Sequence, residues 1–455
     1  MTDIIKNNDY TVEITGLTHE GLGVGRINNL AIFVKGAIPG ETILAKVIKI
    51  NKSYAVGKLL KIIKASENRA EPFCKVYGKC GGCSLQHMDY SAQLKFKTDM
   101  VRENLKRIGK LEDVIVNPAI GMENSLRYRN KAQFPVGMAD GRPVIGFYSV
   151  RSHNIIDSET CGIQDELSDR VREVVRKFIA ENKVSVYDEV TGKGLVRHVM
   201  TRVGFKTGEV MVVIVVNGKK LPFHDKLVRS LTYAVPDIKS IVLNVNTQKS
   251  NVILGSENIT LFGRDVITDY IGKFKFEISP LSFYQVNPVQ TEVLYEKALE
   301  YAGLTGSETV FDLYCGIGTI SLFLSQKAKK VYGVEVVEDA IRDAKRNAEI
   351  NGVDNCEFIV GEAEKVIPEL YGQGVKADVV VVDPPRKGCD EVLLQTLVDM
   401  APKRIVYVSC NPSTLARDLG YLSERGFEVN KVQPVDMFPY TSHVECVTLM
   451  SRVEK

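Results

Sequence analysis

The first 64 residues alternate between apolar and polar positions in short runs, a pattern that predicts strands. Such runs begin at Tyr10, Leu30, Glu41 and Tyr54, and glycines separate them. We expect residues 1–64 to form a five-stranded barrel of the OB type, a common nucleic-acid-binding module. Six lysines between residues 46 and 64 would give this barrel a basic face.

The pattern between residues 65 and 275 mixes helical and strand periods and predicts a central α/β domain. The basic side chains of its first strand would lie on one face by alternation, where they suit contacts with RNA phosphates; these are Arg127, Arg129 and Lys131. A solvated polar face is the alternative interpretation. Helices are expected near 91–108 and 166–181, and strands near 126–134, 143–148, 198–203, 210–216 and 240–246.

From residue 276 to the C-terminus, strand and helix patterns alternate, which is typical of a doubly wound, largely parallel sheet. The predicted fold class is therefore a multidomain α/β protein with a Rossmann-like domain over residues 276–455. Ligands of such sheets bind at the carboxyl ends of the strands. The strands are expected near 309–313, 330–335, 356–360, 378–382, 404–409 and 428–435.

Composition limits the setting in which the protein works. The chain has 455 residues, of which 44% are hydrophobic, yet its longest apolar run, 210–216, is too short to span a bilayer. The first ten residues are polar and lack the apolar core of a signal peptide. We therefore expect a soluble, cytoplasmic protein that does not bind membranes, and we expect it to be a monomer.

Charge is distributed unevenly along the chain. Residues 1–151 hold 23 Lys and Arg against 14 Asp and Glu, whereas the whole chain has a formal net charge of +3. The basic front part indicates a polyanion as partner. Ordinary solvated lysines are the alternative.

Three of the nine cysteines, Cys74, Cys80 and Cys83, lie within ten residues of one another. Their spacing, with two glycines between Cys80 and Cys83, predicts a metal centre rather than core packing. Zinc and an iron–sulfur cluster both suit thiolates spaced in this way. Cys161 is a candidate fourth ligand, because the Thr160-Cys161-Gly162 turn could approach the group.

The first strand of the C-terminal domain runs into a glycine-containing loop, Val310-Phe-Asp-Leu-Tyr-Cys-Gly-Ile-Gly-Thr319. Glycines let the backbone approach a ligand at a helix start, but this loop is not the G-x-G-x-x-G of dinucleotide-binding proteins. Asp312 suits a methionine ammonium better than a pyrophosphate, so we expect S-adenosylmethionine rather than NAD. Glu335 ends the second strand, where it can accept hydrogen bonds from a ribose; a solvated strand end is the alternative.

Two further strands end in residues with chemically useful side chains. Asp383 follows a buried run and precedes two prolines, which fix the backbone. Cys410 ends the next strand, where Asn411-Pro412 forces the chain out of the sheet, so we expect it beside Asp383. A cysteine in this place is either a small core residue or a nucleophile. Cys389 is a competing nucleophile, although its place at a predicted helix start makes it the weaker candidate.

The two ends of this domain supply a base and aromatic rings. Glu445 enters an apolar strand, where a carboxylate is costly unless it is paired or functional. His443 is the alternative base. Phe283 and Tyr284 lie beside Gln285, and such a ring could stack on a flipped base; core packing is the alternative for either ring.

Taken together, these motifs make the chain resemble the bacterial RNA (uracil-5-)-methyltransferase family over essentially its full length. The front barrel, with Gly21-Leu-Gly-Val-Gly-Arg26, is similar to a TRAM domain. With the four cysteines, it makes the chain most similar to the 23S rRNA branch. The chain departs from the family pattern at Thr319, where related enzymes often carry Asn. The ordered motifs are Phe283-Tyr-Gln285-Val-Asn287, Asp312-Leu-Tyr-Cys-Gly316, Asp383-Pro-Pro-Arg386, Ser409-Cys-Asn-Pro412 and His443-Val-Glu445.

The resemblance implies methylation of carbon 5 of one or more unpaired, flipped-out uridines in 23S rRNA. Cys410 would add to C6 of the uracil, Glu445 would remove the C5 proton, and Phe283 would meet the base. The residues that would hold S-adenosylmethionine are Gln285, Tyr314, Glu335 and Asp383. The ligands of a [4Fe–4S] cluster would be Cys74, Cys80, Cys83 and Cys161.

Two other functions stay open from the sequence. The chain could be an RNA-binding module whose sheet senses the cofactor without catalysis. It could also be a methyltransferase of small molecules or proteins, for which the basic barrel has no obvious use.

Overall fold

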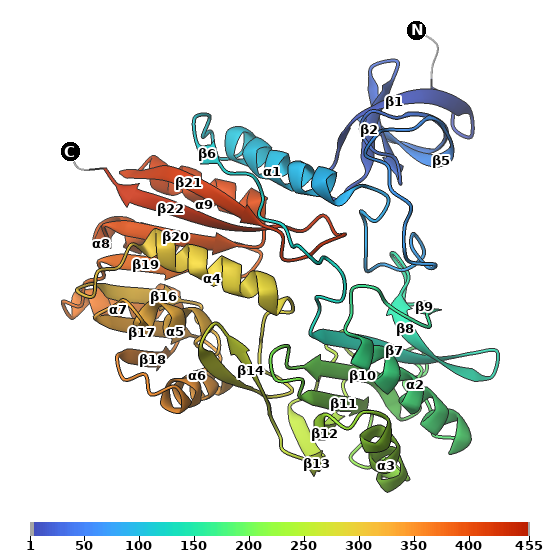
Figure 1. The fold of residues 1–455 in the computed structure, drawn as a ribbon. Helices are drawn as coiled ribbons and strands as arrows, with labels where there is room; N and C mark the ends of the chain where they lie inside the picture. The colour runs from blue at the N-terminus through green and yellow to red at the C-terminus, as the bar shows by residue number, and fades with distance from the viewer. Residues whose placement is uncertain (1–3, 454–455) are drawn as a thin grey trace.

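The computed structural model describes residues 4–453, and its N-terminal part is a closed five-stranded barrel. Alternate residues such as Val12, Ile32 and Ile43 fill the barrel. A Cβ at Gly25 would lie 2.4 Å from Val12 Cγ1, so the close crossing of the first two strands requires glycine there. The predicted barrel is confirmed, whereas the OB type stays a prediction. The strands, which pair in the order β1-β2-β3-β5-β4 (Figure 1), are β1 (Asp9–Leu17), β2 (Gly23–Ile27), β3 (Leu30–Lys35), β4 (Thr42–Ile50) and β5 (Tyr54–Lys64).

The middle of the chain forms a seven-stranded sheet in the order β13-β12-β11-β10-β7-β8-β9, with two helices against it (Figure 1). β10 and β11 are buried along their whole length because both faces of the sheet are covered. The elements are β7 (Lys131–Ala139), β8 (Arg142–Tyr148), β9 (Ile155–Asp157), α2 (Glu166–Glu181), β10 (Val196–Val203), β11 (Val210–Val216), α3 (His224–Ala234), β12 (Ile238–Val245) and β13 (Glu257–Gly263).

The prediction of a strand over 126–134 is wrong in its first half. The strand begins only at Lys131, and Arg127 has a left-handed backbone with φ of 53°. The Arg127 side chain binds the carbonyls of Cys161 and Gln164 at 2.7 and 3.0 Å. These tertiary hydrogen bonds hold the chain in a loop despite its alternating pattern, so Arg127 does not share a strand face with Arg129 and Lys131.

The C-terminal part is an eight-stranded sheet in the order β18-β17-β16-β19-β20-β22-β21-β6. Strands β16 to β20 run parallel, and β22 runs antiparallel to both β20 and β21. The chain moves outward from β16 in both directions, which places a ligand crevice at the carboxyl ends of β16 and β19. A hairpin precedes the sheet: β14 (Ile267–Ile271) and β15 (Phe274–Ile278). The sheet domain itself comprises α4 (Pro288–Ala302), β16 (Thr309–Leu313), α5 (Thr319–Ser325), β17 (Lys330–Glu335), α6 (Glu338–Ile350), β18 (Cys356–Val360), α7 (Ala363–Gly372), β19 (Val379–Val382), α8 (Glu391–Met400), β20 (Arg404–Ser409), α9 (Pro412–Ser423), β21 (Phe427–Val435) and β22 (Glu445–Arg452).

An early segment of the chain packs on this last sheet. Helix α1 (Tyr90–Arg107) lies beside α9 and β21, and the short strand β6 (Ile115–Val116) pairs with β21 (Figure 1). Lys97 of α1 forms a fully buried ion pair with Asp436, at 2.5 Å. The segment predicted to open the central domain is thus attached to the C-terminal sheet.

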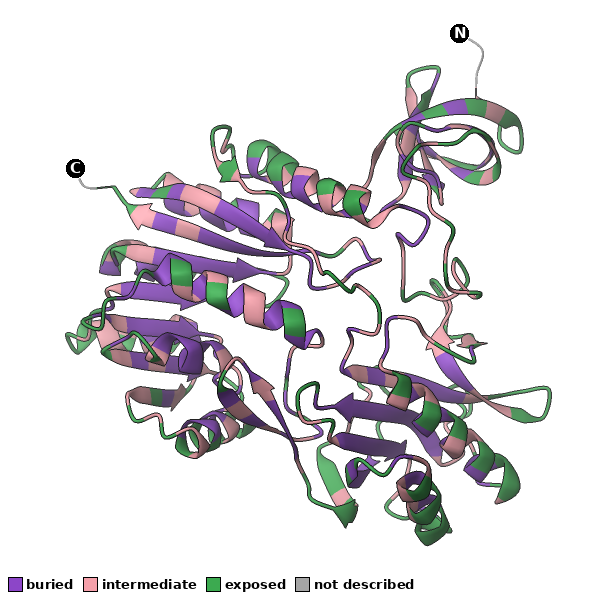
Figure 2. Ribbon diagram, in the orientation of Figure 1, coloured by how far each residue is buried: buried purple, intermediate pink, exposed green. Residues whose placement is uncertain are grey.

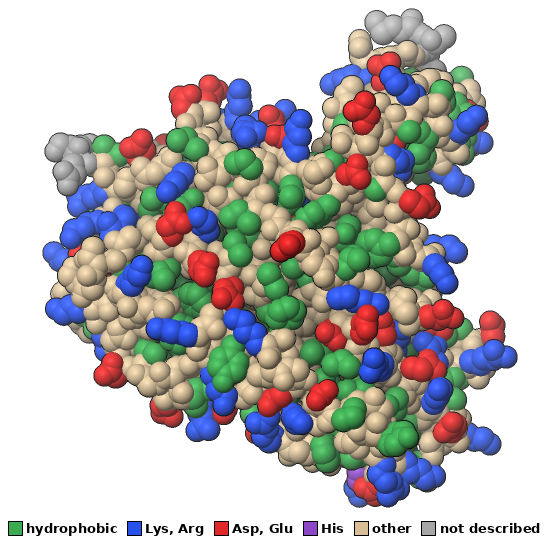
Figure 3. All heavy atoms as spheres, in the orientation of Figure 1, with side chains coloured by type: hydrophobic (Ala, Val, Ile, Leu, Met, Phe, Trp, Pro, Cys, Tyr) green, Lys and Arg blue, Asp and Glu red, His purple; other side chains and the backbone are tan. Residues whose placement is uncertain are grey.

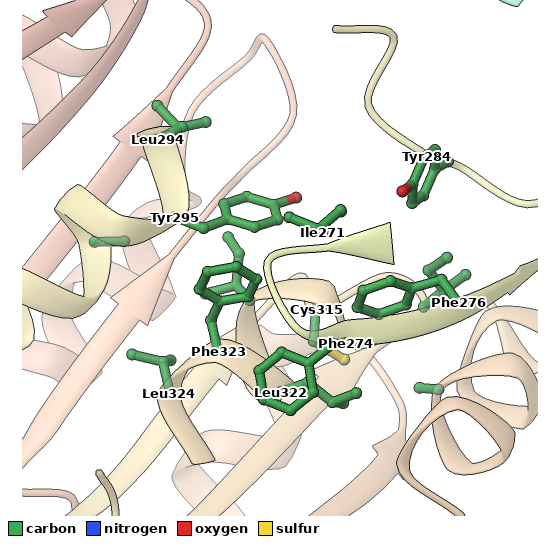
Figure 4. Close-up of a cluster of buried hydrophobic side chains, with 14 of the residues drawn as sticks. Ile271, Phe274, Phe276, Tyr284, Leu294, Tyr295, Cys315, Leu322, Phe323 and Leu324 are labelled. Carbon is green, nitrogen blue, oxygen red and sulfur yellow. The ribbon is translucent and has the colours of Figure 1, made fainter. Parts of the chain in front are cut away.

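The central sheet and the C-terminal sheet share one apolar core. It contains Met211 and Val213 of the central sheet together with residues of the hairpin, α4 and α5. Figure 4 shows Phe274 of the hairpin beside Phe323, and Phe276 on the side of Tyr284. Figure 2 shows the buried strands of both sheets in purple. Among residues 4–453, no helix combines the length and apolar character that crossing a membrane would require.

Candidate active site

A cavity of about 1520 Å³ opens beside the carboxyl ends of the C-terminal strands. Its wall includes the residues that the family resemblance implied for catalysis, for the cofactor and for the uracil, but not Asp312 or Cys389. These residues are separated by up to 162 positions along the chain, so the fold alone brings them together. They are Phe283, Gln285, Tyr314, Glu335, Asp383, Cys410 and Glu445.

Cys410 directly follows β20, and Glu445 is the first residue of the neighbouring strand β22. The antiparallel register pairs Ser409 of β20 with Cys446 of β22, so the next opposed positions are those of Cys410 and Glu445. Opposed residues of antiparallel strands have Cα atoms about 4.5–5.5 Å apart. The strand stops where it was predicted to stop, because Asn411 caps α9 through its side chain. The charge of Glu445 raises the pKa of Cys410, so the thiol and the proposed base lie near each other in the cavity.

Burial and nearby charges shift the pKa values of both groups. Burial, together with the carboxyl groups of Glu445 and Asp383, raises the pKa of Cys410 to about 11. Glu445 is 4% exposed, and burial raises its pKa well above the usual value. Burial also raises the pKa of Asp383 to about 6. The thiol of Cys410 is therefore protonated at neutral pH, and Glu445 binds a proton more tightly than an ordinary carboxylate.

Arg386 is a residue to which the sequence motifs assigned no role. It lines the cavity, and its charge lowers the pKa values of both Cys410 and Glu445 against the effect of burial. Its carbonyl accepts hydrogen bonds from Asn411 Nδ2 at 3.0 Å and Thr414 Oγ1 at 3.2 Å, which ties its loop to the start of α9. The one signal in the sequence is its position directly after two prolines.

The competing candidates occupy different environments. Cys389 is buried, donates its backbone N–H to Asp418 and does not line the cavity. As predicted, it lies at a helix start, because Asp390 caps α8. His443 does line the cavity, and partial burial of its ring together with the charge of Arg386 lowers its pKa.

The glycine-containing loop between β16 and α5 has an unusual backbone conformation. Tyr314, Gly316 and Gly318 all have a left-handed backbone, with φ of 65°, 54° and 80°. Glu335 accepts hydrogen bonds from the backbone N–H groups of Gly316 at 3.3 Å and Val337 at 3.0 Å. Since a carboxylate has about four acceptor positions, Glu335 keeps capacity for a ribose hydroxyl.

Asp312, which the sequence suggested for the methionine ammonium, lies inside β16 rather than in the cavity wall. It is fully buried within β16, accepts a hydrogen bond from Ser321 Oγ at 2.5 Å and does not line the cavity. Burial raises its pKa to about 7. Instead, Tyr314 and Thr319 form this wall: Tyr314 donates to Glu364 at 2.7 Å, and the Thr319 hydroxyl lies 2.9 Å from that of Tyr295.

The two neighbouring aromatic rings at the start of the domain have opposite environments. Phe283 is 69% exposed and lines the cavity, whereas Tyr284 is 3% exposed in the shared core (Figure 4). Phe283 is therefore the ring that is free to meet a substrate. The backbone carbonyl of Gln285 accepts a hydrogen bond from Asn130 Nδ2 at 3.0 Å.

The structure supports the predicted metal centre less well than it supports the predicted cavity residues. The four cysteines are partly buried and unbridged, and charge on Cys161, Cys80 and Cys74 raises the pKa of Cys83, which shows that the four lie near one another. The turn of Cys161 does approach the others, because Phe73 packs against Gly162. However, in the described part of the chain no three His, Cys, Asp or Glu side chains are arranged to hold a metal ion. The metal centre stays a prediction.

Comparisons with known proteins agree with this site. Residues 237–453 match the family described as tRNA (Uracil-5-)-methyltransferase, and residues 7–60 match the TRAM domain. An uncharacterized RNA methyltransferase of Clostridium tetani is 58% identical over 446 residues, which are 98% of this chain and 97% of that protein. The crystal structure of the Pyrococcus abyssi tRNA (uracil-54, C5)-methyltransferase with S-adenosyl-L-homocysteine is 30% identical, has a TM-score of 0.77, and covers 97% of this chain and 100% of that one.

The fold, the cavity and these relatives define an S-adenosylmethionine-dependent RNA methyltransferase with a TRAM domain. Within that class, the chain belongs to the tRNA/RNA uracil-5-methyltransferase family.

Proposed function

We propose that the protein methylates carbon 5 of one or more loop uridines in 23S rRNA, with Cys410 as nucleophile and Glu445 as base. The observation that carries this proposal is the opposition of Cys410 and Glu445 in the same cavity as the glycine-containing loop. Carbon 5 of uracil is a weak nucleophile, so the reaction needs covalent activation at carbon 6.

Each residue then has a defined task. The Cys410 thiol first loses its proton to solvent, and the resulting thiolate bonds to C6 and makes C5 enolate-like. S-adenosylmethionine, when bound, supplies the methyl group that C5 takes up. Glu445 accepts the C5 proton, and the electron pair of that C–H bond expels Cys410 as a thiolate, which restores the ring double bond. Phe283 stacks on the flipped base, while Gln285, Tyr314, Glu335 and Asp383 hold the cofactor.

The barrel supports RNA as the substrate. Five of its six lysines between residues 46 and 64 are exposed, and they alternate with exposed Ile48, Leu60 and Ile63 on β4 and β5. Figure 3 shows Lys and Arg side chains on the barrel with acidic side chains among them. Exposed cations of this kind bind phosphates regardless of sequence, so the barrel would add affinity and the cavity would select the base.

The identity of the RNA is tested by mapping 5-methyluridine in cells with and without the gene. We expect one or more 5-methyluridines to disappear from 23S rRNA while tRNA is unchanged. The similar protein from Pyrococcus abyssi is named a tRNA (uracil-54, C5)-methyltransferase. Loss of 5-methyluridine from tRNA alone would therefore refute the rRNA assignment and support tRNA as the substrate.

The same proposal includes a [4Fe–4S] cluster on Cys74, Cys80, Cys83 and Cys161, with zinc as the alternative, in a cytoplasmic monomer. The reaction needs no redox step, so the cluster would have a structural or RNA-positioning role. Anaerobically purified protein should be brown, absorb broadly in the visible range and contain iron and sulfide. A colourless protein that carries zinc would refute the cluster, and size-exclusion chromatography with light scattering tests the monomer.

A further inference from the structure

The loop that carries Phe283 joins the hairpin β14–β15 to α4 and borders the cavity. Because the Phe283 ring is 69% exposed, burial of the ring cannot fix its direction. Its direction must come from the backbone on either side. The contacts of that backbone lead to a residue of the central sheet that no motif singled out.

Arg202 lies on β10 and is 4% exposed. Its guanidinium donates to the carbonyl of Pro280 at 3.3 Å and to the carbonyl of Ser282. Ser282 directly precedes Phe283 in the chain, and Pro280 lies two positions before Ser282. The Arg202 side chain, on a buried strand, thus holds the backbone directly before Phe283 by two hydrogen bonds.

The positive charge of Arg202 lowers the stability of the fold because the side chain is buried. Burial alone lowers its pKa to about 10, and no carboxylate among residues 4–453 offsets that effect. Its cross-strand partner is another cation, Lys131, whose pKa is lowered to about 8 by burial, Arg202 and Arg129. A buried cation without a carboxylate lowers stability, whereas an apolar side chain would fill the space without that cost. The two loop carbonyls are the hydrogen-bond acceptors that the charged group gains in return.

The rest of the loop is fixed from both sheets. The Ser282 hydroxyl donates to Asp343 of α6 at 2.9 Å, so this residue is bound to the cofactor side through its side chain and to the central sheet through its carbonyl. On the other side of Phe283, the Asn130 backbone N–H donates to the carbonyl of Val286 at 2.9 Å. Phe283 is the exposed residue between these two anchored points.

We propose that Arg202 is a positioning residue that orients Phe283 for stacking on the target uracil. This inference rests on the proposed function. Stacking on an aromatic ring stabilises a bound base, and that contribution depends on the plane of the ring. A ring held in one orientation also avoids an ordering cost when the uridine flips in.

The chain contains no tryptophan, so Phe283→Trp introduces a single fluorescent reporter. We expect the fluorescence anisotropy of Trp at this position to fall when Arg202→Gln is added, and to fall less with Arg202→Lys, which keeps a charged donor. Arg264→Gln is the matched control, because Arg264 is an exposed arginine paired with Glu209. Unchanged anisotropy in Arg202→Gln would overturn the proposal, and this readout does not require methyl transfer.

A double-mutant cycle tests the effect on the reaction. Arg202→Gln should lower kcat/KM for RNA by about 10–100-fold, the scale expected for a misplaced group, while affinity for S-adenosylhomocysteine changes less than about twofold. In a Phe283→Ala background, the same change should cost less than about threefold, because no ring is left to orient. An equal loss in both backgrounds, or an equal loss of cofactor affinity, would indicate a general structural role and refute the proposal.

If Arg202→Gln does not fold, Arg202→Lys replaces it in the same two backgrounds. We then expect kcat/KM to fall about tenfold when Phe283 is present and less than about threefold in the Phe283→Ala background. The outcomes also separate this inference from the proposed function. If the unmodified protein transfers no methyl group to uridine, the proposed function fails. If the unmodified protein does methylate uridine and the Arg202 variants are equally active, only the role of Arg202 is refuted.

Discussion

The buried ion pair between Lys97 and Asp436 offers a quantitative test of how the early part of the chain supports the active site. Both side chains are fully buried, and Lys97 Nζ lies 2.5 Å from Asp436 Oδ1. Lys97 also donates to the carbonyl of Phe438 at 3.1 Å. Asp436 follows β21 directly, and the loop from Asp436 leads to His443 and Glu445.

Lys97→Met would leave the Asp436 carboxylate buried without its counter-charge. Removing one member of a buried ion pair costs about 3–5 kcal/mol. Burial lowers the pKa of Lys97 although Asp436 opposes that effect, so desolvation of the ammonium outweighs its attraction to the carboxylate. Replacing both residues, in Lys97→Met with Asp436→Leu, should therefore restore part of the lost stability.

Urea denaturation followed by circular dichroism measures this change. The matched control is Lys95→Met, on the same helix but exposed, for which we expect less than about 0.5 kcal/mol. A loss for Lys97→Met of less than about 1 kcal/mol, or one no larger than that of the control, would refute the energetic reasoning.

Three further predictions concern the site itself. Glu445→Gln should lower the rate of methyl transfer by about 10²–10⁴-fold and let a covalent protein–RNA adduct accumulate on denaturing gels, because the C5 proton stays in place; normal turnover without an adduct would contradict this. Arg386→Met should raise the pKa of Cys410 further above about 11, so that the rate at pH 7–8 falls about tenfold per pKa unit and the rising limb of the pH–rate profile moves to higher pH. Arg386→Lys keeps the charge and should have a largely normal rate, and superimposable pH–rate profiles for Arg386→Met and the unmodified protein would refute the prediction. Glu335→Gln should weaken binding of S-adenosylhomocysteine about tenfold in calorimetry with RNA affinity unchanged, since it loses charge-assisted bonds to the loop; equal losses for both ligands would point to unfolding instead.

The C-terminal sheet could be predicted from the sequence because its physics is local. The strands Thr309–Leu313, Lys330–Glu335, Cys356–Val360 and Arg404–Ser409 begin and end at the residues expected. Parallel strands buried on both faces are continuous apolar runs, and helix starts such as Asn411-Pro412 mark where they end. The placement of Asp383 and Cys410 in one cavity follows from the same rule.

The parts that could not be predicted depend on distant contacts. Arg127 lies in an alternating stretch, yet bonds to the Cys161 turn keep it out of the strand. Strand β6 has only two residues and exists because β21 offers it an edge. Asp312 precedes the loop as expected, but Ser321 holds it inside the sheet. For Arg127 and β6 a partner far along the sequence decides the outcome, whereas Ser321 lies nine residues after Asp312, on the next helix. The hydrophobic pattern of the chain encodes none of these contacts.

The most direct test of the central claim compares methyl transfer from labelled S-adenosylmethionine to RNA by Cys410→Ala and Cys389→Ala. Both changes remove one thiol from neighbouring loops, but only Cys410 lines the cavity, opposite Glu445. We predict that Cys389→Ala keeps the activity within about threefold, and that Cys410→Ala loses it by at least about 10⁴-fold, as expected for a covalent nucleophile. Substantial methyl transfer by Cys410→Ala, with folded protein and normal cofactor affinity, would contradict the assignment of Cys410 as the nucleophile.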